Sequence, residues 1–246
     1  LMRINHKTSH PMNLMFISGL FAGGWIWDRI INYLPNDKFN IIKQEFPLSR
    51  LGDNIPSLIT NLSEVIQRKK DNSVILFGNS LGGLLALDLA RRHPGKVVSV
   101  IASGCPGLED VNLGIGIPKR NDERWFKLLV DTLFVDSSYI TESHIKKTQK
   151  LFQNRRTFLN IVRLSKETSQ YSAHKILYDI KCPILFIWGE NDIVTPPKPW
   201  QQISTNFTNV DFHLIKSCGH SPMIEKPFVF FEIMNQFLNE KVLSFK

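Results

Sequence analysis

The chain has 246 residues, of which 43% are hydrophobic and 21% are charged, a composition that is typical of globular proteins and excludes disordered and fibrous classes. Lysine and arginine outnumber aspartate and glutamate by 30 to 22, and the resulting net charge of +8 is by itself only weak evidence for an acidic partner. Three cysteines without a Cys-x-x-Cys pair argue against a disulfide scaffold or a cysteine zinc site, and they predict a reducing, cytoplasmic location. No apolar run reaches the roughly 18 residues of a membrane span.

The first apolar stretch, residues 14–27, has two interpretations. Because Arg3 and Lys7 precede it, a charged head and an apolar body are present, as in a secretory signal peptide. The short run at residues 13–17, followed by a loop with glycine, is instead typical of a buried strand. We favour the strand because the pattern that follows requires it.

Strand-like and helix-like segments alternate after this point. Short apolar runs predict strands at residues 14–17, 40–43, 74–77, 97–102, 184–188 and 210–215. Helical spacing predicts helices at residues 25–34, 55–69, 84–92 and 227–238. Short apolar strands that are separated by helices imply an α/β fold, with a mostly parallel sheet covered on both faces.

The alternation stops between residues 104 and 180, where the pattern is helical at residues 125–134 and 145–164. Roughly 75 residues are too many for a connection between two strands. We therefore expect a helical cap at residues 105–180, inserted after the fourth strand into a core formed by residues 1–104 and 181–246.

A nucleophile is predicted at Ser80. The sequence Gly-Asn-Ser-Leu-Gly at residues 78–82 fits Gly-x-Ser-x-Gly, and it lies between a predicted strand and a predicted helix. In that setting the serine occupies a tight turn, its hydroxyl is exposed above the sheet, and the helix N-terminus behind it favours developing negative charge. An ordinary glycine turn is the alternative.

A serine hydroxyl needs a base, and His220 is the expected one because it follows the last predicted strand. The other histidines lie in the N-terminal segment, in the cap, at a helix end or within a strand: His6, His10, His93, His144, His174 and His213. Asp192, directly after the strand at residues 184–188, is expected to hold the tautomer of His220. Glu190 and the pair at residues 109–110 are the alternatives for this acid.

These motifs together resemble the α/β-hydrolase fold over nearly the whole chain. They are the turn at residues 78–83, Trp-Gly-Glu-Asn-Asp at residues 188–192, and Cys-Gly-His at residues 218–220 followed by Glu-Lys-Pro at residues 225–227. The chain order serine, aspartate, histidine also agrees with the order expected for this fold. The expected cap and the overall size of the chain are similar to those of pimeloyl-ACP methyl ester esterases of biotin synthesis. The Gly-Asn-Ser turn resembles that of meta-cleavage-product C–C hydrolases.

The resemblance implies a carboxylic ester hydrolase that forms an acyl-enzyme, needs no cofactor or metal, and has an acyl carrier protein as a candidate partner. The first loop reads Ser18-Gly19-Leu20, where the family usually has His-Gly-x. By position, the backbone N–H groups of Leu20 and Leu81 would form the oxyanion hole. Few residues precede the first strand, so we expect a sheet without the family's leading strand pair, of about six strands.

Two further groups of residues have both functional and plain structural interpretations. The aromatic residues Trp25, Trp125, Phe126 and Phe134 could line an acyl pocket, although aromatic residues at helical spacing are more often core. The segment at residues 143–166 has seven basic residues and no acidic one. This segment is either a solvated helix face or a docking face for an acidic partner: Lys146, Lys147, Lys150, Arg155, Arg156, Arg163 and Lys166.

Ester hydrolysis is therefore the leading functional hypothesis. C–C bond hydrolysis and thioester hydrolysis could use the same triad, and a ligand receptor that keeps the triad is an alternative from another class. Nucleic acid is a poor candidate because the basic segment lacks a binding motif.

Overall fold

Six parallel strands form the centre of the computed structural model, which describes residues 11–35, 37–44, 46–69, 73–108 and 122–243. Their spatial order is β2-β1-β3-β4-β5-β6, and every neighbouring pair is parallel. The strands are β1 (Met12–Ile17), β2 (Phe39–Lys43), β3 (Val74–Asn79), β4 (Val97–Ser103), β5 (Ile184–Gly189) and β6 (Val210–Ile215). This confirms the predicted α/β fold and all six predicted strands.

The sheet has a switch point between β1 and β3, which are neighbours in space. From β1 the chain crosses outward to β2, and from β3 it proceeds in the opposite direction to β4. Ile17 pairs with Gly78, so both strands end at the same level. Open α/β sheets bind ligands in the crevice at such a point, beyond the carboxyl ends of the strands.

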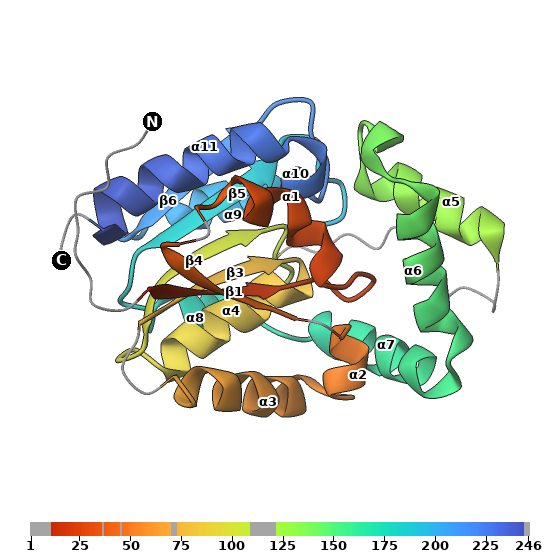
Figure 1. The fold of residues 1–246 in the computed structure, drawn as a ribbon, viewed down its shortest axis with the longest axis horizontal. Coiled ribbons are helices and arrows are strands. Elements are labelled where there is room, and N and C mark those ends of the chain that lie inside the picture. Colours follow the sequence, from red (N-terminus) through yellow and green to blue (C-terminus); the bar gives the residue numbers. More distant parts are fainter. Residues whose placement is uncertain (1–10, 36, 45, 70–72, 109–121, 244–246) are drawn as a thin grey trace.

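Helices cover both faces of the sheet (Figure 1). One face packs against α3 (Ile55–Gln67), α4 (Leu81–Arg92), α8 (Ala173–Leu177) and α9 (Pro197–Ser204). The other packs against the 3-10 helix η1 (Gly24–Trp27), α1 (Asp28–Tyr33), α10 (Pro222–Glu225), α11 (Pro227–Phe237) and the terminal turns at Leu238–Leu243. Alternate residues of each strand face opposite helix layers, for example Leu76 and Phe77. Burial on both faces explains why the four central strands β1, β3, β4 and β5 read as continuous apolar runs, whereas the edge strands β2 and β6 are partly exposed and carry polar residues.

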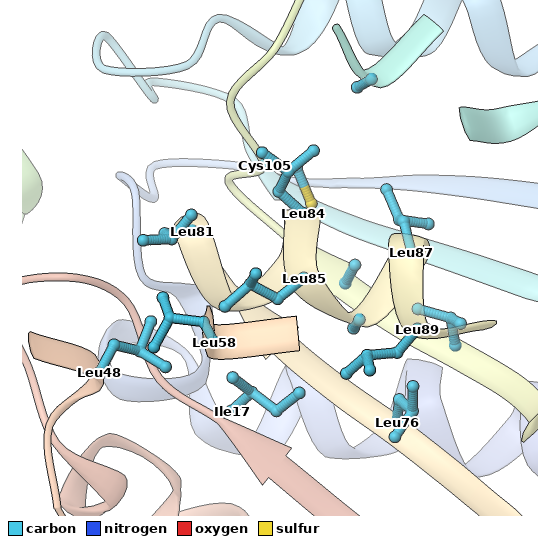
Figure 2. Close-up of a cluster of buried hydrophobic side chains, with 14 of the residues drawn as sticks. Ile17, Leu48, Leu58, Leu76, Leu81, Leu84, Leu85, Leu87, Leu89 and Cys105 are labelled. Atoms are coloured by element: carbon cyan, nitrogen blue, oxygen red, sulfur yellow. The ribbon is translucent and has the colours of Figure 1, made fainter. Parts of the chain in front are cut away.

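Helix α4 is the central helix of the first layer. Every residue from Leu81 to Ala90 is buried, because the helix lies between the sheet and its neighbours α3 and α8. Figure 2 shows its leucines beside Ile17 and Leu76 of the sheet and beside Leu58 of α3. A helix that starts next to Ser80 is thus held rigidly by the core.

The cap segment is the part of the chain between β4 and β5. Its described helices are α5 (Glu123–Leu133), the 3-10 helix η2 (Ser137–Tyr139), α6 (Glu142–Gln153), α7 (Arg155–Thr168) and α8. Figure 1 shows α5, α6 and α7 beside the sheet rather than on its faces. The helical stretch predicted at residues 145–164 is two helices, because Asn154 is extended and its side chain accepts a hydrogen bond from Thr157 N at 3.0 Å, which caps α7.

Several short elements differ from the sequence prediction. The helix expected at residues 25–34 is divided into η1 and α1, and the helix expected from residue 84 begins at Leu81. Helices α2 (Leu48–Leu51), α8, α9 and α10 were not predicted; each spans eight residues or fewer, too short for a helical period to stand out. Among the described helices, none combines the length and the apolar character needed to cross a membrane.

Candidate active site

Ser80 occupies the sharp turn between β3 and α4, with φ 56° and ψ −128°. Residues other than glycine rarely adopt a positive φ, and such strain concentrates at functional sites. Gly78 permits the turn, because a Cβ there would collide with the carbonyl oxygen of Gly82 and lie 2.5 Å from the Cα of Gly83. At Gly82 a Cβ would lie 2.5 Å from the carbonyl oxygen of Ile17. The glycines predicted from the motif are therefore required by close backbone packing.

The loop after β1 lies directly against this turn, since a Cβ at Gly19 would be 3.1 Å from the Cβ of Ser80. It carries Leu20, while Leu81 is the first residue of α4. Within the described part of the chain, neither Leu20 N–H nor Leu81 N–H donates a hydrogen bond. Two unused backbone donors beside a serine are what an oxyanion hole requires.

His220 and Asp192 form a buried pair. His220 Nδ1 lies 2.9 Å from Asp192 Oδ2, and the two residues are 4% and 3% exposed. They reach each other from the loops after β6 and β5, which are adjacent strands. Glu190, the alternative acid two residues away, is exposed, and the alternative pair at residues 109–110 lies outside the described residues.

Further hydrogen bonds hold Asp192 in its ionised form. Val194 N and Thr195 N donate to Oδ1 at 2.9 and 3.0 Å, and Thr195 Oγ1 donates to Oδ2 at 2.8 Å. Burial alone would raise the pKa of Asp192, but the charge and hydrogen bond of His220 and the Thr195 bonds outweigh it and lower the pKa. The carboxylate is thereby kept ready to orient an imidazole.

Asn79 connects the serine turn to the histidine loop. Its Nδ2 donates to the carbonyl oxygens of Ser103 and His220 at 3.3 and 3.1 Å, and its side chain is buried. Ser80 N also donates to Ser103 O at 2.9 Å. Gly104, with φ 60°, has no room for a Cβ, which would lie 2.8 Å from His220 Cε1. The ends of β3 and β4 therefore position His220 near Ser80.

Ser80 and His220 line one cavity of about 110 Å³ between the core and the cap segment. Its walls are mostly apolar and come from the loop after β1 and from α5 and α6. Trp25 stacks on His144 of α6 with ring centroids 4.3 Å apart, so the core and the cap meet at its wall. Burial, and then the nearby Lys147 and Arg29, lower the pKa of His144.

Three of the four aromatic residues predicted for the pocket line this cavity: Trp25, Phe126 and Phe134. Trp125 does not. Its ring contacts Phe126 and Phe152 with centroids 5.2 Å apart in each case, within an aromatic cluster of the cap. Trp125 therefore lies behind the cavity wall.

The seven basic residues at positions 143–166 are exposed but differ in their partners. Lys146 pairs with Glu142 at 2.6 Å and Arg163 pairs with Asp53 at 3.1 Å. Lys150, Arg155 and Arg156 have no ion pair with a described residue. Of the described His, Cys, Asp and Glu side chains, no three are grouped closely enough to hold a metal ion.

Sequence reasoning missed four residues that the structure brings to the site. Asn79 and Thr195 were visible only as neighbours of predicted residues, and His144 was assigned to the cap without a role. Glu225 was noted in a motif, but its contacts were not foreseen. The hydrogen bonds and cavity positions of these four residues connect parts of the chain that are far apart in the sequence. The spacing of the motif around His220 is the only sequence signal for any of them, and it concerns Glu225.

Comparisons with known proteins identify the family of this chain. The model of the Hydrolase_4 family, described as serine aminopeptidase, S33, matches residues 48–227. Pimeloyl-[acyl-carrier protein] methyl ester esterase of Wigglesworthia glossinidia brevipalpis is 27% identical over 259 residues, which cover 94% of this chain and 95% of that protein.

Two solved structures share the fold. An esterase from Exiguobacterium antarcticum has a TM-score of 0.76 at 17% identity and covers 93% of this chain and 92% of its own. The meta-cleavage product hydrolase from Pseudomonas fluorescens IP01 has a TM-score of 0.79 at 17% identity and covers 94% and 92%. At these identities the likeness is one of fold.

Proposed function

The chain belongs to the serine aminopeptidase S33 family of α/β-hydrolase-fold enzymes, and from this premise we propose that it is a carboxylic ester hydrolase whose catalytic residues are Ser80, His220 and Asp192. One observation carries the proposal: a serine on a strained turn and a histidine paired with a buried carboxylate line the same apolar cavity. A serine, a base and an acid that orients the base are the parts of acyl transfer through a covalent intermediate.

In the first half of the reaction, Ser80 Oγ attacks the ester carbonyl and His220 accepts its proton. Asp192 holds Nδ1–H and stabilises the imidazolium that forms. The N–H groups of Leu20 and Leu81 receive the negative charge of the tetrahedral intermediate, and one such donor contributes about 3 kcal/mol to lowering the barrier. His220 then protonates the leaving alcohol, and an acyl group remains on Ser80.

In the second half, His220 takes a proton from water, whose oxygen attacks the acyl-enzyme carbonyl. The bond to Ser80 Oγ then breaks, His220 returns the proton to this oxygen, and the acid is released. The cavity that receives the acyl group is about 110 Å³, below the roughly 300 Å³ at the lower end for drug-sized ligands. Among free small esters, we therefore expect short acyl groups to react faster than long ones.

A carrier-bound ester is the substrate class that we propose beyond this chemistry, and the pimeloyl-carrier esterase is the relative that supports it. Lys150, Arg155 and Arg156 form the proposed docking site for the acidic carrier, with Lys146 and Arg163 beside it in ion pairs. A role in biotin synthesis and a cytoplasmic location stay predictions.

Hydrolysis of a C–C bond is the second candidate, and a specific observation favours it. Such a reaction requires a polar cap group at the far end of the substrate, and His144 and Thr148 of α6 line the cavity. The lowered pKa of His144 keeps its ring neutral at neutral pH, so it can accept or donate a hydrogen bond there.

Replacing Ser80 by alanine tests the proposal. Hydrolysis of p-nitrophenyl esters should fall by at least about 10⁴-fold, with short acyl chains the best substrates of the parent protein. Ser103→Ala is the matched control, because the Ser103 hydroxyl is buried without a described partner and its carbonyl, which accepts from Ser80 N, is kept.

Undiminished esterase activity in Ser80→Ala would exclude the mechanism. Faster turnover of a vinylogous diketone than of any ester by the parent protein would favour the second candidate.

A further inference from the structure

Glu225 is a fully buried carboxylate that the proposed mechanism does not use. It ends α10, the single helical turn that directly follows the histidine loop, residues 217–221. This turn reverses the direction of the chain, so that Glu225 packs against the histidine loop. A buried carboxylate is costly unless hydrogen bonds compensate for the lost water.

Three backbone N–H groups supply that compensation. Gly219 N donates to Oε2 at 2.8 Å, while Val135 N and Asp136 N donate to Oε1 at 3.1 and 2.8 Å. The two oxygens thus face different parts of the chain. One binds the residue that precedes His220, and the other binds the cap segment directly after α5.

A second connection joins the same two parts. His220 N donates to Leu133 O at 2.8 Å, and a Cβ at Gly219 would collide with that same carbonyl oxygen. The histidine loop and the end of α5 therefore pack backbone against backbone. Because Leu133 and Phe134 line the cavity, this junction joins the wall of the cavity to the base.

The thiol of Cys218 also lies next to Glu225. Burial, and then the charge of Glu225, raise the pKa of Cys218, so the thiol stays protonated beside the carboxylate. The carboxylate of Glu225 therefore remains the hydrogen-bond acceptor for all three backbone N–H groups.

We propose that Glu225 is a positioning residue: it fixes the backbone of Gly219, and through it the imidazole of His220, relative to Ser80 and to the cap segment at residues 133–136. This inference rests on the proposed ester hydrolysis. Catalytic groups held by backbone hydrogen bonds stay within the narrow range that proton transfer needs, and a misplacement of about 1 Å can reduce the rate by roughly 100-fold.

The isosteric change Glu225→Gln tests the role, because the amide keeps one acceptor and loses the other. We expect kcat to fall by roughly 10- to 100-fold. We expect KM to change by less than about twofold, since Glu225 does not line the cavity. The low-field proton resonance of His220 Nδ1–H should shift or broaden. Glu190→Gln, an exposed carboxylate two residues from Asp192, is the matched control and should leave kcat and this resonance unchanged.

Glu225→Asp is a second variant, which keeps the charge but is too short to reach both Gly219 and the cap segment. Folding is monitored by circular dichroism, and kcat is normalised to folded protein. A folded Gln or Asp variant with parental kcat and an unchanged His220 resonance overturns the role of Glu225. Failure of the parent protein to hydrolyse any ester, or activity that survives Ser80→Ala, overturns the proposed function instead.

Discussion

Asp192 accepts hydrogen bonds from His220, Thr195 and Val194 although only 3% of its surface is exposed. Two of these partners follow it by two and three residues, so the loop after β5 folds around its own carboxylate. A side chain held in this way is ionised before substrate arrives. At the scale of single residues, the site is therefore organised around a charge that the loop itself stabilises.

This gives a prediction for Asp192→Asn. A folded-state pKa below the usual value of about 3.9 means that Asp192 contributes stability above that pH, and that the contribution is lost as pH falls through the folded pKa. The difference in unfolding free energy between parent and variant should be large at pH 7 and shrink below about pH 4. Urea denaturation at pH 7, 5 and 3.5 measures it.

In the same variant, kcat should fall on the order of 10⁴-fold, because an asparagine favours the wrong imidazole tautomer. Glu190→Gln is the control for both measurements, since its carboxylate is exposed. A parent-to-variant difference that stays constant from pH 7 to pH 3.5 would contradict the assignment of the depressed pKa to Asp192.

Among the elements, the β3–α4 turn has little tolerance for change. Gly78 faces backbone atoms of Gly82 and Gly83, and backbone cannot move aside as a flexible side chain can. The turn also presents Ser80 at φ 56°. The strain is sustained because α4 is buried on all sides from Leu81 to Ala90.

We expect Gly78→Ala to destabilise the protein by about 3 kcal/mol or more and to abolish hydrolysis, because its Cβ must displace the turn. Gly95→Ala is the matched control: a Cβ at Gly95 meets no atom within 4 Å, so the change should stabilise by about 0.4–1 kcal/mol. Urea denaturation compares the two, and equal effects of the two changes would be incompatible with the close packing at Gly78.

For the whole molecule, the charge of +8 is unevenly distributed. Arg155 and Arg156 occupy the first two positions of α7, where the helix dipole is positive and cations are unfavourable. Two arginines at that end lower the stability of the helix and place two exposed positive charges side by side. This placement supports the proposed docking of an acidic carrier.

Reversal of both charges, Arg155→Glu with Arg156→Glu, should therefore raise the stability of the protein and lower its activity on a carrier-bound ester. Stability should rise by several tenths of a kcal/mol per residue, because acidic side chains suit a helix N-terminus. At low salt, kcat/KM for a carrier-bound ester should fall roughly tenfold. Turnover of p-nitrophenyl esters should not change, because neither arginine lines the cavity.

A control with the same change in net charge is Lys198→Glu with Lys241→Glu, both exposed and outside the cap segment. An equal loss of carrier-ester hydrolysis in this control would indicate a general charge effect. No loss in either variant would remove the docking site from the proposal.

What the sequence determined by itself was local. Runs of apolar residues predicted the six strands, most clearly the four central ones, because strands buried on both faces need apolar residues throughout. The spacing around Ser80, together with a turn that only glycines allow, predicted the serine turn. The positions of Asp192 and His220 after strands predicted that they would approach each other, because parallel strands end at the same edge of a sheet.

Tertiary structure decided what depends on contacts between distant segments. Glu225 binds N–H groups about 90 residues away in the chain, and Asn79 binds a carbonyl 141 residues away. Trp125 lies behind the cavity wall while its neighbour Phe126 lines it. Local patterns report burial and turns, but the partner of a buried polar group is chosen only when the elements pack, because its hydrogen bonds must then be satisfied by whichever backbone lies opposite.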